Sequence, residues 1–187
     1  MPDLTRLIDA AQKGDARAAS ELLPLVYDEL RKLAAARMAA EKPGHTLDAT
    51  ALVHEAYLRL VAPDQQQSWN GRGHFFGAAA EAMRRILVED ARRKLRMRHG
   101  GSFQRQNLDA GGLASPQTPE NLVALSEALD HFSTVNFQAA ELVKLRFFAG
   151  LTNEDAAATL GVSPRKANQI WAYARAWLLE SLDRHVI

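Results

Sequence analysis

Residues 160–177 read LGVSPRKANQIWAYARAW, and the positions in and before this stretch predict a helix-turn-helix. Thr152 is suited to cap a first helix that begins at the next residue. Gly161 stands where the turn needs a left-handed residue. Ser163 and Pro164 then supply the cap and first turn of a second helix. This spacing favours a helix-turn-helix over an ordinary pair of surface helices.

The second helix is expected to have one buried face and one polar face. The residues expected to face the core are Ala167, Ile170, Trp171, Ala174 and Leu178. At 100° per residue, Arg165, Gln169 and Ala172 lie opposite them, flanked by Lys166 and Asn168. In a major groove arginine pairs with guanine, and asparagine or glutamine pairs with adenine, each good pair contributing about 1–3 kcal/mol. The pattern predicts duplex DNA binding by the front half of this helix.

The rest of the chain is predicted to be helical, because its apolar residues recur at three- and four-residue steps. A short helix should end near Gly14, and Pro24 predicts a kink or break in the next one. The further helices are expected near 48–61, 75–98, 120–132, 137–149, 152–160 and 163–182. Residues 99–119 are rich in glycine, proline and small polar residues and indicate a linker. We therefore expect an all-α chain of two small helical domains, 1–98 and 120–187.

Composition excludes several classes of protein. The chain has 187 residues, 47% hydrophobic residues, a net charge of +1 and no cysteine, so disulfides and thiolate metal sites are excluded. The histidines are scattered and show no metal-binding spacing, and no nucleophile–base pair is evident. No apolar run reaches the roughly 18 residues of a membrane span. We expect a cytoplasmic protein that is not an enzyme and needs no metal or cofactor.

The middle of the chain combines aromatic and basic residues. Residues 84–98 contain seven Arg or Lys against two acidic residues, which suits a phosphate backbone, although a solvated helix face would look similar. Aromatics beside amide and basic groups favour unstacked bases, at about 1–3 kcal/mol per base. Just before this run, such residues are Trp69, Asn70, Arg72, His74, Phe75 and Phe76. Trp69 could equally fill a gap in the core. These features predict a protein that opens duplex DNA.

The order of these segments resembles that of bacterial RNA polymerase sigma factors of the extracytoplasmic-function (ECF) type. Residues 4–34, LTRLIDAAQKGDARAASELLPLVYDELRKLA, and 48–60, DATALVHEAYLRL, resemble the start and the core-binding helix of region 2. Residues 69–94, WNGRGHFFGAAAEAMRRILVEDARRK, resemble the segment that melts and reads the −10 element. Residues 145–178, LRFFAGLTNEDAAATLGVSPRKANQIWAYARAWL, resemble region 4, which reads the −35 element.

The resemblance implies partners and site residues. Core RNA polymerase would be bound through its β′ clamp helices and β flap, the clamp helices by Asp48, Leu52, Val53, His54, Glu55, Leu58 and Arg59. The −10 element would be met by Trp69, Asn70, Arg72, His74, Phe75, Arg84, Arg85, Arg92, Arg93, Lys94, Arg96 and Arg98. The −35 element would be met by Arg165, Lys166, Asn168, Gln169, Ala172 and Arg175. An anti-sigma factor is a possible further partner, whereas a membrane or small-molecule substrate is not expected.

One alternative function stays open at this point. A free-standing helix-turn-helix regulator would bind a duplex operator without polymerase, and its N-terminal half would sense a signal or dimerise. A change such as Glu55→Lys or Leu58→Arg should abolish function only in a sigma factor.

Overall fold

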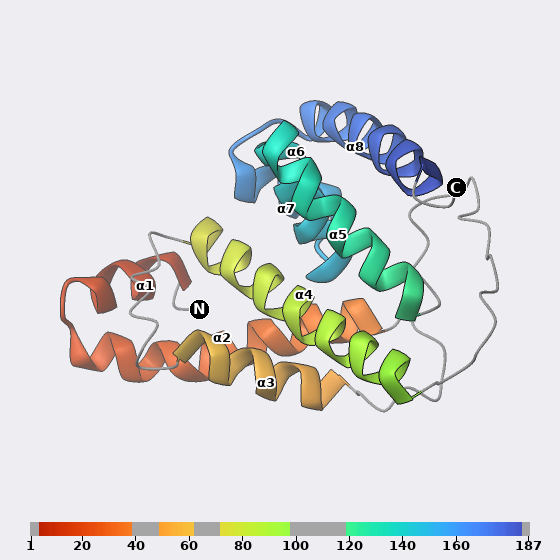
Figure 1. Cartoon of the computed structure of the whole chain (residues 1–187). Coiled ribbons are helices and arrows are strands. Elements are labelled where there is room, and N and C mark those ends of the chain that lie inside the picture. Colours follow the sequence, from red (N-terminus) through yellow and green to blue (C-terminus); the bar gives the residue numbers. More distant parts are fainter. Residues whose placement is uncertain (1–3, 39–48, 62–71, 98–118, 185–187) are drawn as a thin grey trace.

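The computed structural model describes residues 4–38, 49–61, 72–97 and 119–184, and these ranges contain helices and no strand (Figure 1). The all-α prediction is therefore confirmed. The first half comprises α1 (Leu4–Gln12), α2 (Ala16–Met38), α3 (Ala49–Val61) and α4 (Arg72–Met97). The second half comprises α5 (Pro119–Val135), α6 (Phe137–Val143), the π-helical η1 (Lys144–Phe148), α7 (Asn153–Leu160) and α8 (Pro164–Arg184). Most of the expected linker lies outside the described residues.

Two local predictions in the first half need correction. Pro24 lies inside α2, which continues on both sides of it, so the predicted break does not occur; a proline removes one backbone donor and the surrounding helix is held by packing along its length. Helix α4 begins at Arg72 and not near Phe75, so the end of the expected aromatic loop is helical. The predicted stop near Gly14 is confirmed, since this residue has a φ of +88° between α1 and α2.

Helix α4 lies at the centre of the molecule. Figure 1 shows it between the α2–α3 pair and α5, and it contacts α1 and α3 from its own half and α5, η1 and α7 from the other. Its buried apolar residues are Phe75, Phe76, Ala79, Ala80, Ala82, Met83, Ile86, Leu87, Val88 and Ala91. These positions cover more than half of the helix circumference, so α4 is largely a core helix, and its exposed residues lie mainly on one stripe with Arg85, Glu89, Arg92 and Arg96.

The two halves share one hydrophobic core, which extends from Leu4 in α1 to Leu178 in α8. One close approach between them is at Gly73, near the start of α4. A Cβ atom added there would lie 2.9 Å from the backbone oxygen of Thr159 in α7. The halves are therefore packed against each other, a relation for which the sequence offered no signal.

Candidate nucleic-acid interface

The helix-turn-helix forms as its residues predicted. The Thr152 hydroxyl accepts a hydrogen bond from the Asp155 backbone N–H (3.1 Å) and donates one to the Asp155 carboxylate (2.8 Å). Gly161 ends α7 in the left-handed region, with a φ of 67°. The Ser163 hydroxyl accepts from the Lys166 backbone N–H (3.1 Å) and caps α8. Both caps satisfy helix N–H groups that would otherwise lack a partner, which fixes where α8 begins.

The inward face of α8 packs against α5, α6 and α7. Ala167, Ile170, Ala174 and Leu178 are buried as expected. The tryptophans are only half-buried, and Trp177 stacks on Phe132 of α5 with 4.5 Å between ring centroids. Aromatic stacking of this kind stabilises a contact by about 0.5–1.5 kcal/mol beyond its buried area. The tryptophan end of α8 therefore anchors the helix to the body of the protein.

Arg146 in η1 also contacts α8, and the sequence analysis did not predict this contact. Its guanidinium carbon lies 3.9 Å from the centre of the Trp171 ring, a cation–π contact. Burial lowers the pKa of Arg146. The π-helical turn places this arginine under α8, and the sequence contains no simple signal for a π-helix.

The outward face of α8 carries the residues predicted to meet the −35 element. The side chains of Arg165, Lys166, Asn168, Gln169 and Ala172 are exposed and lie on the first three turns of α8. Arg175, one turn further, is only half-exposed. Five of the six predicted residues are therefore accessible to a ligand in this conformation.

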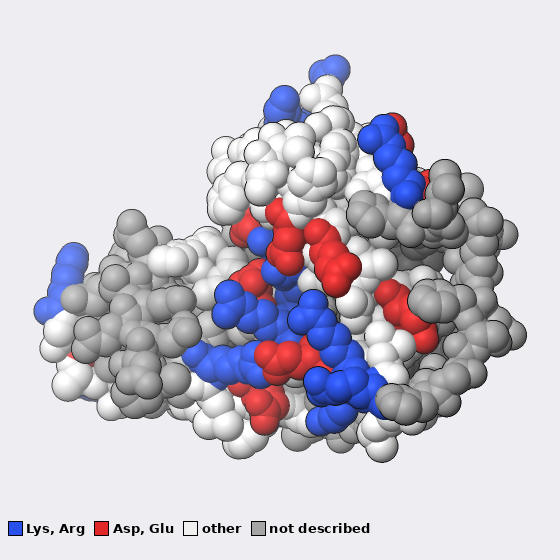
Figure 2. Space-filling model, in the orientation of Figure 1, with Lys and Arg blue, Asp and Glu red and all other residues white. Residues whose placement is uncertain are grey.

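A second group of basic residues lies on α4. Figure 2 shows Lys and Arg side chains gathered over the lower part of this helix, with Asp and Glu side chains among them. The exposed predicted residues are Arg85, Arg92, Arg93 and Arg96, whereas Lys94 is half-buried. Asp90 pairs with Arg93 and, at 2.8 Å, with Lys94. Burial alone would raise the pKa of Asp90, but these two cations hold it below its usual value.

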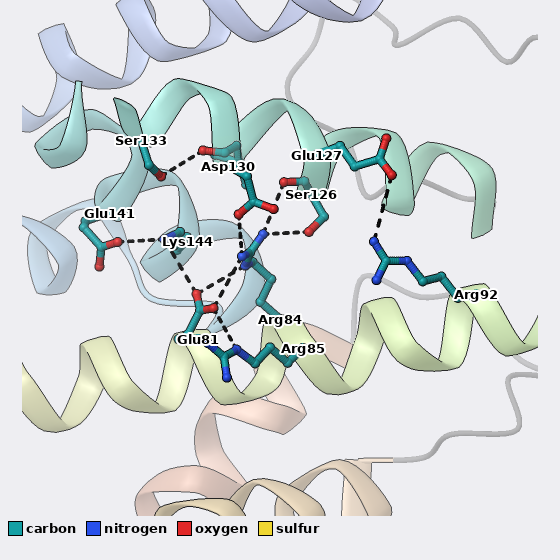
Figure 3. Close-up of polar contacts among 11 residues, drawn as sticks. Glu81, Arg84, Arg85, Arg92, Ser126, Glu127, Asp130, Ser133, Glu141 and Lys144 are labelled. Carbon is teal, nitrogen blue, oxygen red and sulfur yellow. Dashed lines mark hydrogen bonds and ion pairs between the residues drawn. The ribbon is translucent and has the colours of Figure 1, made fainter. Parts of the chain in front are cut away.

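Arg84 occupies a different environment from the other arginines of α4. It is buried, and its guanidinium donates to the Ser126 hydroxyl (2.6 Å) and the Asp130 carboxylate (2.7 Å) of α5 (Figure 3). It also pairs with Glu81 at 3.2 Å. Burial alone would lower the pKa of Arg84, but the two carboxylates outweigh it and raise that pKa. The predicted DNA contact of Arg84 is therefore not available in this conformation, because α5 occupies its donors.

Phe75 was predicted to touch an unstacked base, and its side chain is not accessible to a ligand in this conformation. It is 0% exposed and lies in the core beside Phe76, with 5.4 Å between the ring centroids. The aromatic signal here thus reflects packing of the first turn of α4, and His74 is the neighbour that is exposed. Trp69, Asn70 and Arg98 lie outside the described residues, as does the side chain of Arg72.

The residues predicted to bind core polymerase divide between the two sides of α3. Leu52 and Val53 are fully buried and pack in the core, so they are not part of an accessible surface here. His54, Glu55 and Leu58 are exposed, and Leu58 is a large apolar residue with 48% exposure. The resemblance to ECF sigma factors, and not the helical periodicity, assigned residues of both sides to the polymerase. Asp48 lies outside the described residues.

Arg59 links α3 to α4. Its guanidinium donates to both carboxylate oxygens of Glu89, at 3.2 and 2.7 Å. The hydrogen bond with Glu89 raises the pKa of Arg59, and the same bond lowers that of Glu89. This two-point contact orients the exposed side of α3 relative to the basic residues of α4.

Two other kinds of site are absent from the described ranges. No group of three or more His, Cys, Asp or Glu side chains is arranged there to hold a metal ion. None of the helices in these ranges is both long and apolar enough to cross a membrane.

Comparison with known proteins agrees with the geometry. The family described as ECF sigma factor matches residues 1–184, which is nearly the whole chain. No curated protein and no solved structure matches it. The match spans both the basic helix α4 and the helix-turn-helix. The chain therefore belongs to the ECF sigma factors, a family of non-enzymatic proteins that act in transcription initiation.

Proposed function

We propose that this sigma factor binds core RNA polymerase through the exposed side of α3 and directs it to promoters through α8 and α4. In this proposal α8 reads the −35 element as a duplex, and α4 with the segment before it reads the −10 element as a single strand. The observation that carries the proposal is the capped helix-turn-helix with its exposed polar face on α8.

Three properties of α8 support duplex reading. The polar face of its first turns is exposed while its inward face and its aromatic end are packed, so the polar face points outward. Its first turns carry arginine, lysine, asparagine and glutamine, the side chains that pair with guanine and adenine edges. Its N-terminal N–H groups also attract phosphate.

The single-strand role of α4 is supported by charge. Arg85, Arg92, Arg93 and Arg96 are exposed along the helix and can follow a phosphate backbone. Each phosphate contact releases condensed counterions, so binding through this helix should weaken steeply with salt. The base-reading part of the site would come from the residues just before α4.

The polymerase contact is assigned to His54, Glu55 and Leu58 of α3. An exposed leucine between polar side chains is typical of the anchor of a protein interface, and anchors commonly contribute 2 kcal/mol or more to binding. The ion pair between Arg59 and Glu89 keeps this surface fixed on the body of the protein.

A free-standing regulator is the second candidate, and one observation favours it. The DNA-facing side of α8 is exposed in the packed chain, so duplex binding would need no polymerase. The two proposals differ in whether α3 has a partner.

The test is a quantitative pull-down with purified bacterial core RNA polymerase. Glu55→Lys and Leu58→Arg should each weaken core binding at least about 30-fold, the effect of losing roughly 2 kcal/mol. Asp28→Lys is the matched control, since it reverses one exposed charge on α2 and should leave core binding unchanged. Absence of core binding by the unaltered chain, with duplex affinity retained, would favour the regulator.

A further inference from the structure

Asn153, the first residue of α7, links the two helices of the helix-turn-helix. Its side-chain amide donates a hydrogen bond to the backbone carbonyl of Pro164, the first residue of α8, at 3.2 Å. These residues directly follow the capping residues Thr152 and Ser163, so the bond joins the N-terminal ends of both helices. In a helix-turn-helix the N-terminal end of the second helix is the part that contacts base edges.

The same side chain lowers the stability of the fold. Its Oδ1 is the one buried side-chain oxygen or nitrogen, within the described residues, that has no hydrogen-bond partner. A buried acceptor without a partner opposes folding, because it has lost its hydrogen bond to water. The bond to Pro164 lies at an exposed residue, where water can replace either partner, so it offsets little of this loss. Stability therefore does not account for an asparagine at this position.

The orientation of the amide follows from its surroundings. Turning it over would place Oδ1 against the carbonyl oxygen of Pro164, where two acceptors repel each other. It would also leave the amide N–H groups in the buried position that Oδ1 now occupies. The amide thus holds the carbonyl of Pro164 in a single arrangement, with Nδ2 as the donor.

Small side chains provide the packing near the first turn of α8. The buried residues of α7 are Ala156 and Ala157, and the first buried residue of α8 is Ala167. The stacked Trp177 anchors the helix about 20 Å away from Pro164, at 1.5 Å per residue. A tilt of about 3° around that anchor would move the first turn by about 1 Å. A contact at the first turn itself restrains this movement far better than one at the aromatic end.

We propose that Asn153 is a positioning residue, which fixes the first turn of α8 at the angle that duplex reading requires. Arg165, Asn168 and Gln169 follow directly on this turn, and a binding geometry of this kind must be held within about 0.5 Å. A displaced turn would lose contacts to base edges, while its positive charges would still attract phosphate. Asn153 acts through α8 and is not itself placed against DNA. This inference rests on the proposed function, which assigns α8 to a duplex.

The test measures the sequence preference of the full-length protein. The unaltered chain first selects a duplex from a pool with a randomised central stretch, and the reference is the same duplex with that stretch shuffled. Fluorescence anisotropy gives the affinity for each duplex, and the ratio of the two affinities is the preference. This ratio reports contacts to bases, because attraction to phosphate is the same for both duplexes.

Asn153→Leu replaces the amide by an apolar side chain of similar size. The preference should fall at least about fivefold, the lower limit for the loss of one bidentate base contact, and the affinity for the shuffled duplex should stay the same. The urea midpoint should be equal or higher, because the unpaired Oδ1 is removed. Asn153→Ala removes the same donor without adding volume, and it should lower the preference to the same extent.

Ala158→Leu is the matched control. It adds the same leucine at an exposed position of α7 and, like Asn153→Leu, leaves the net charge unchanged. It should keep the preference of the unaltered chain. Amide hydrogen exchange provides a readout without DNA, since the N–H groups of residues 166–169 should exchange faster in Asn153→Leu than in the control, and those of residues 174–178 should not.

The outcomes separate this inference from the proposed function. An equal preference and equal exchange in the unaltered chain and both Asn153 variants would overturn the inference and leave the proposed function intact. A proportional loss of affinity for both duplexes, together with a lower urea midpoint, would assign Asn153 to folding and also overturn it. If the unaltered chain enriches no sequence from the pool, the assignment of α8 to duplex reading is contradicted, and this inference with it.

Discussion

Helices α8 and α4 are both assigned to DNA, yet they differ in how accessible their polar residues are. Helix α8 packs through one side only, and Arg165, Asn168 and Gln169 on the other side are exposed. Helix α4 has neighbours from both halves of the molecule, and Arg84 is buried against α5. A basic helix is therefore available for a ligand only where its neighbours leave a side uncovered.

The two helices also differ in the contacts that fix their positions. The position of α8 depends on local features, namely the Ser163 cap, the Gly161 turn and the stacking of Trp177. The position of α4 depends on long-range contacts, such as those of Arg84 with residues 42 and 46 positions away. The features that fix α8 thus lie within the second half, whereas the contacts of α4 with α5 join the two halves.

The largest expected effect concerns the exposed face of α8. Gln169→Ala should weaken binding to a −35 duplex by about 1–3 kcal/mol, because the proposed function gives this residue a bidentate contact to a base edge, which alanine cannot make. Gln138→Ala, at an exposed glutamine of α6, is the matched control and should have no effect. Electrophoretic mobility shift of the full chain with promoter duplex measures both. If the two variants behave alike, α8 does not read bases through this residue.

An effect of similar size, on stability and not on DNA binding, is expected at the glycines of α4, and its sign is informative. Gly73→Ala places a Cβ atom 2.9 Å from the Thr159 oxygen and should destabilise the packed chain by about 1–3 kcal/mol, despite the higher helix propensity of alanine. Gly77→Ala meets nothing within 4 Å and should stabilise the chain by up to about 1 kcal/mol. Urea unfolding measures both free energies. Stabilisation by both substitutions would show that α4 and α7 are not in close contact.

The smallest effect is a dependence of stability on acid. Burial alone would raise the pKa of Glu81, but Arg84, Lys144 and Arg85 outweigh it and hold that pKa below the ordinary value of 4.5. The stabilisation from Glu81 is therefore fully present above pH 4.5 and lost as the pH falls through the lowered pKa. Thermal unfolding between pH 7 and 3 should show this loss, and Glu81→Gln should reduce it. An equally steep loss in the variant would assign it to other carboxylates.

Features encoded locally were predictable from the sequence. The caps at Thr152 and Ser163 and the left-handed Gly161 each follow from a single residue type at a fixed offset. The inward residues of α8 follow from helical periodicity, which is strong because only one side is covered. The ECF resemblance followed from the order of these segments, and the family match confirms it.

Features that depend on tertiary packing were not predictable. The sequence shows that Arg84 is basic but not that Ser126 and Asp130 surround it, since these residues are distant along the chain. Phe75 and Leu52 have the residue types expected of a binding site and are fully buried instead. Composition cannot distinguish an aromatic that binds a ligand from one that fills a core. The residue roles assigned to DNA and polymerase stay predictions.

Run-off transcription with purified core RNA polymerase tests the central claim most directly. The template would carry the region upstream of the chain's own gene, and core polymerase alone would serve as the control. A sigma factor predicts a discrete transcript only when both core and this chain are present, and loss of that transcript with Leu58→Arg. No transcript and no core binding, with duplex affinity retained, would contradict the assignment of α3 to polymerase and leave a DNA-binding regulator.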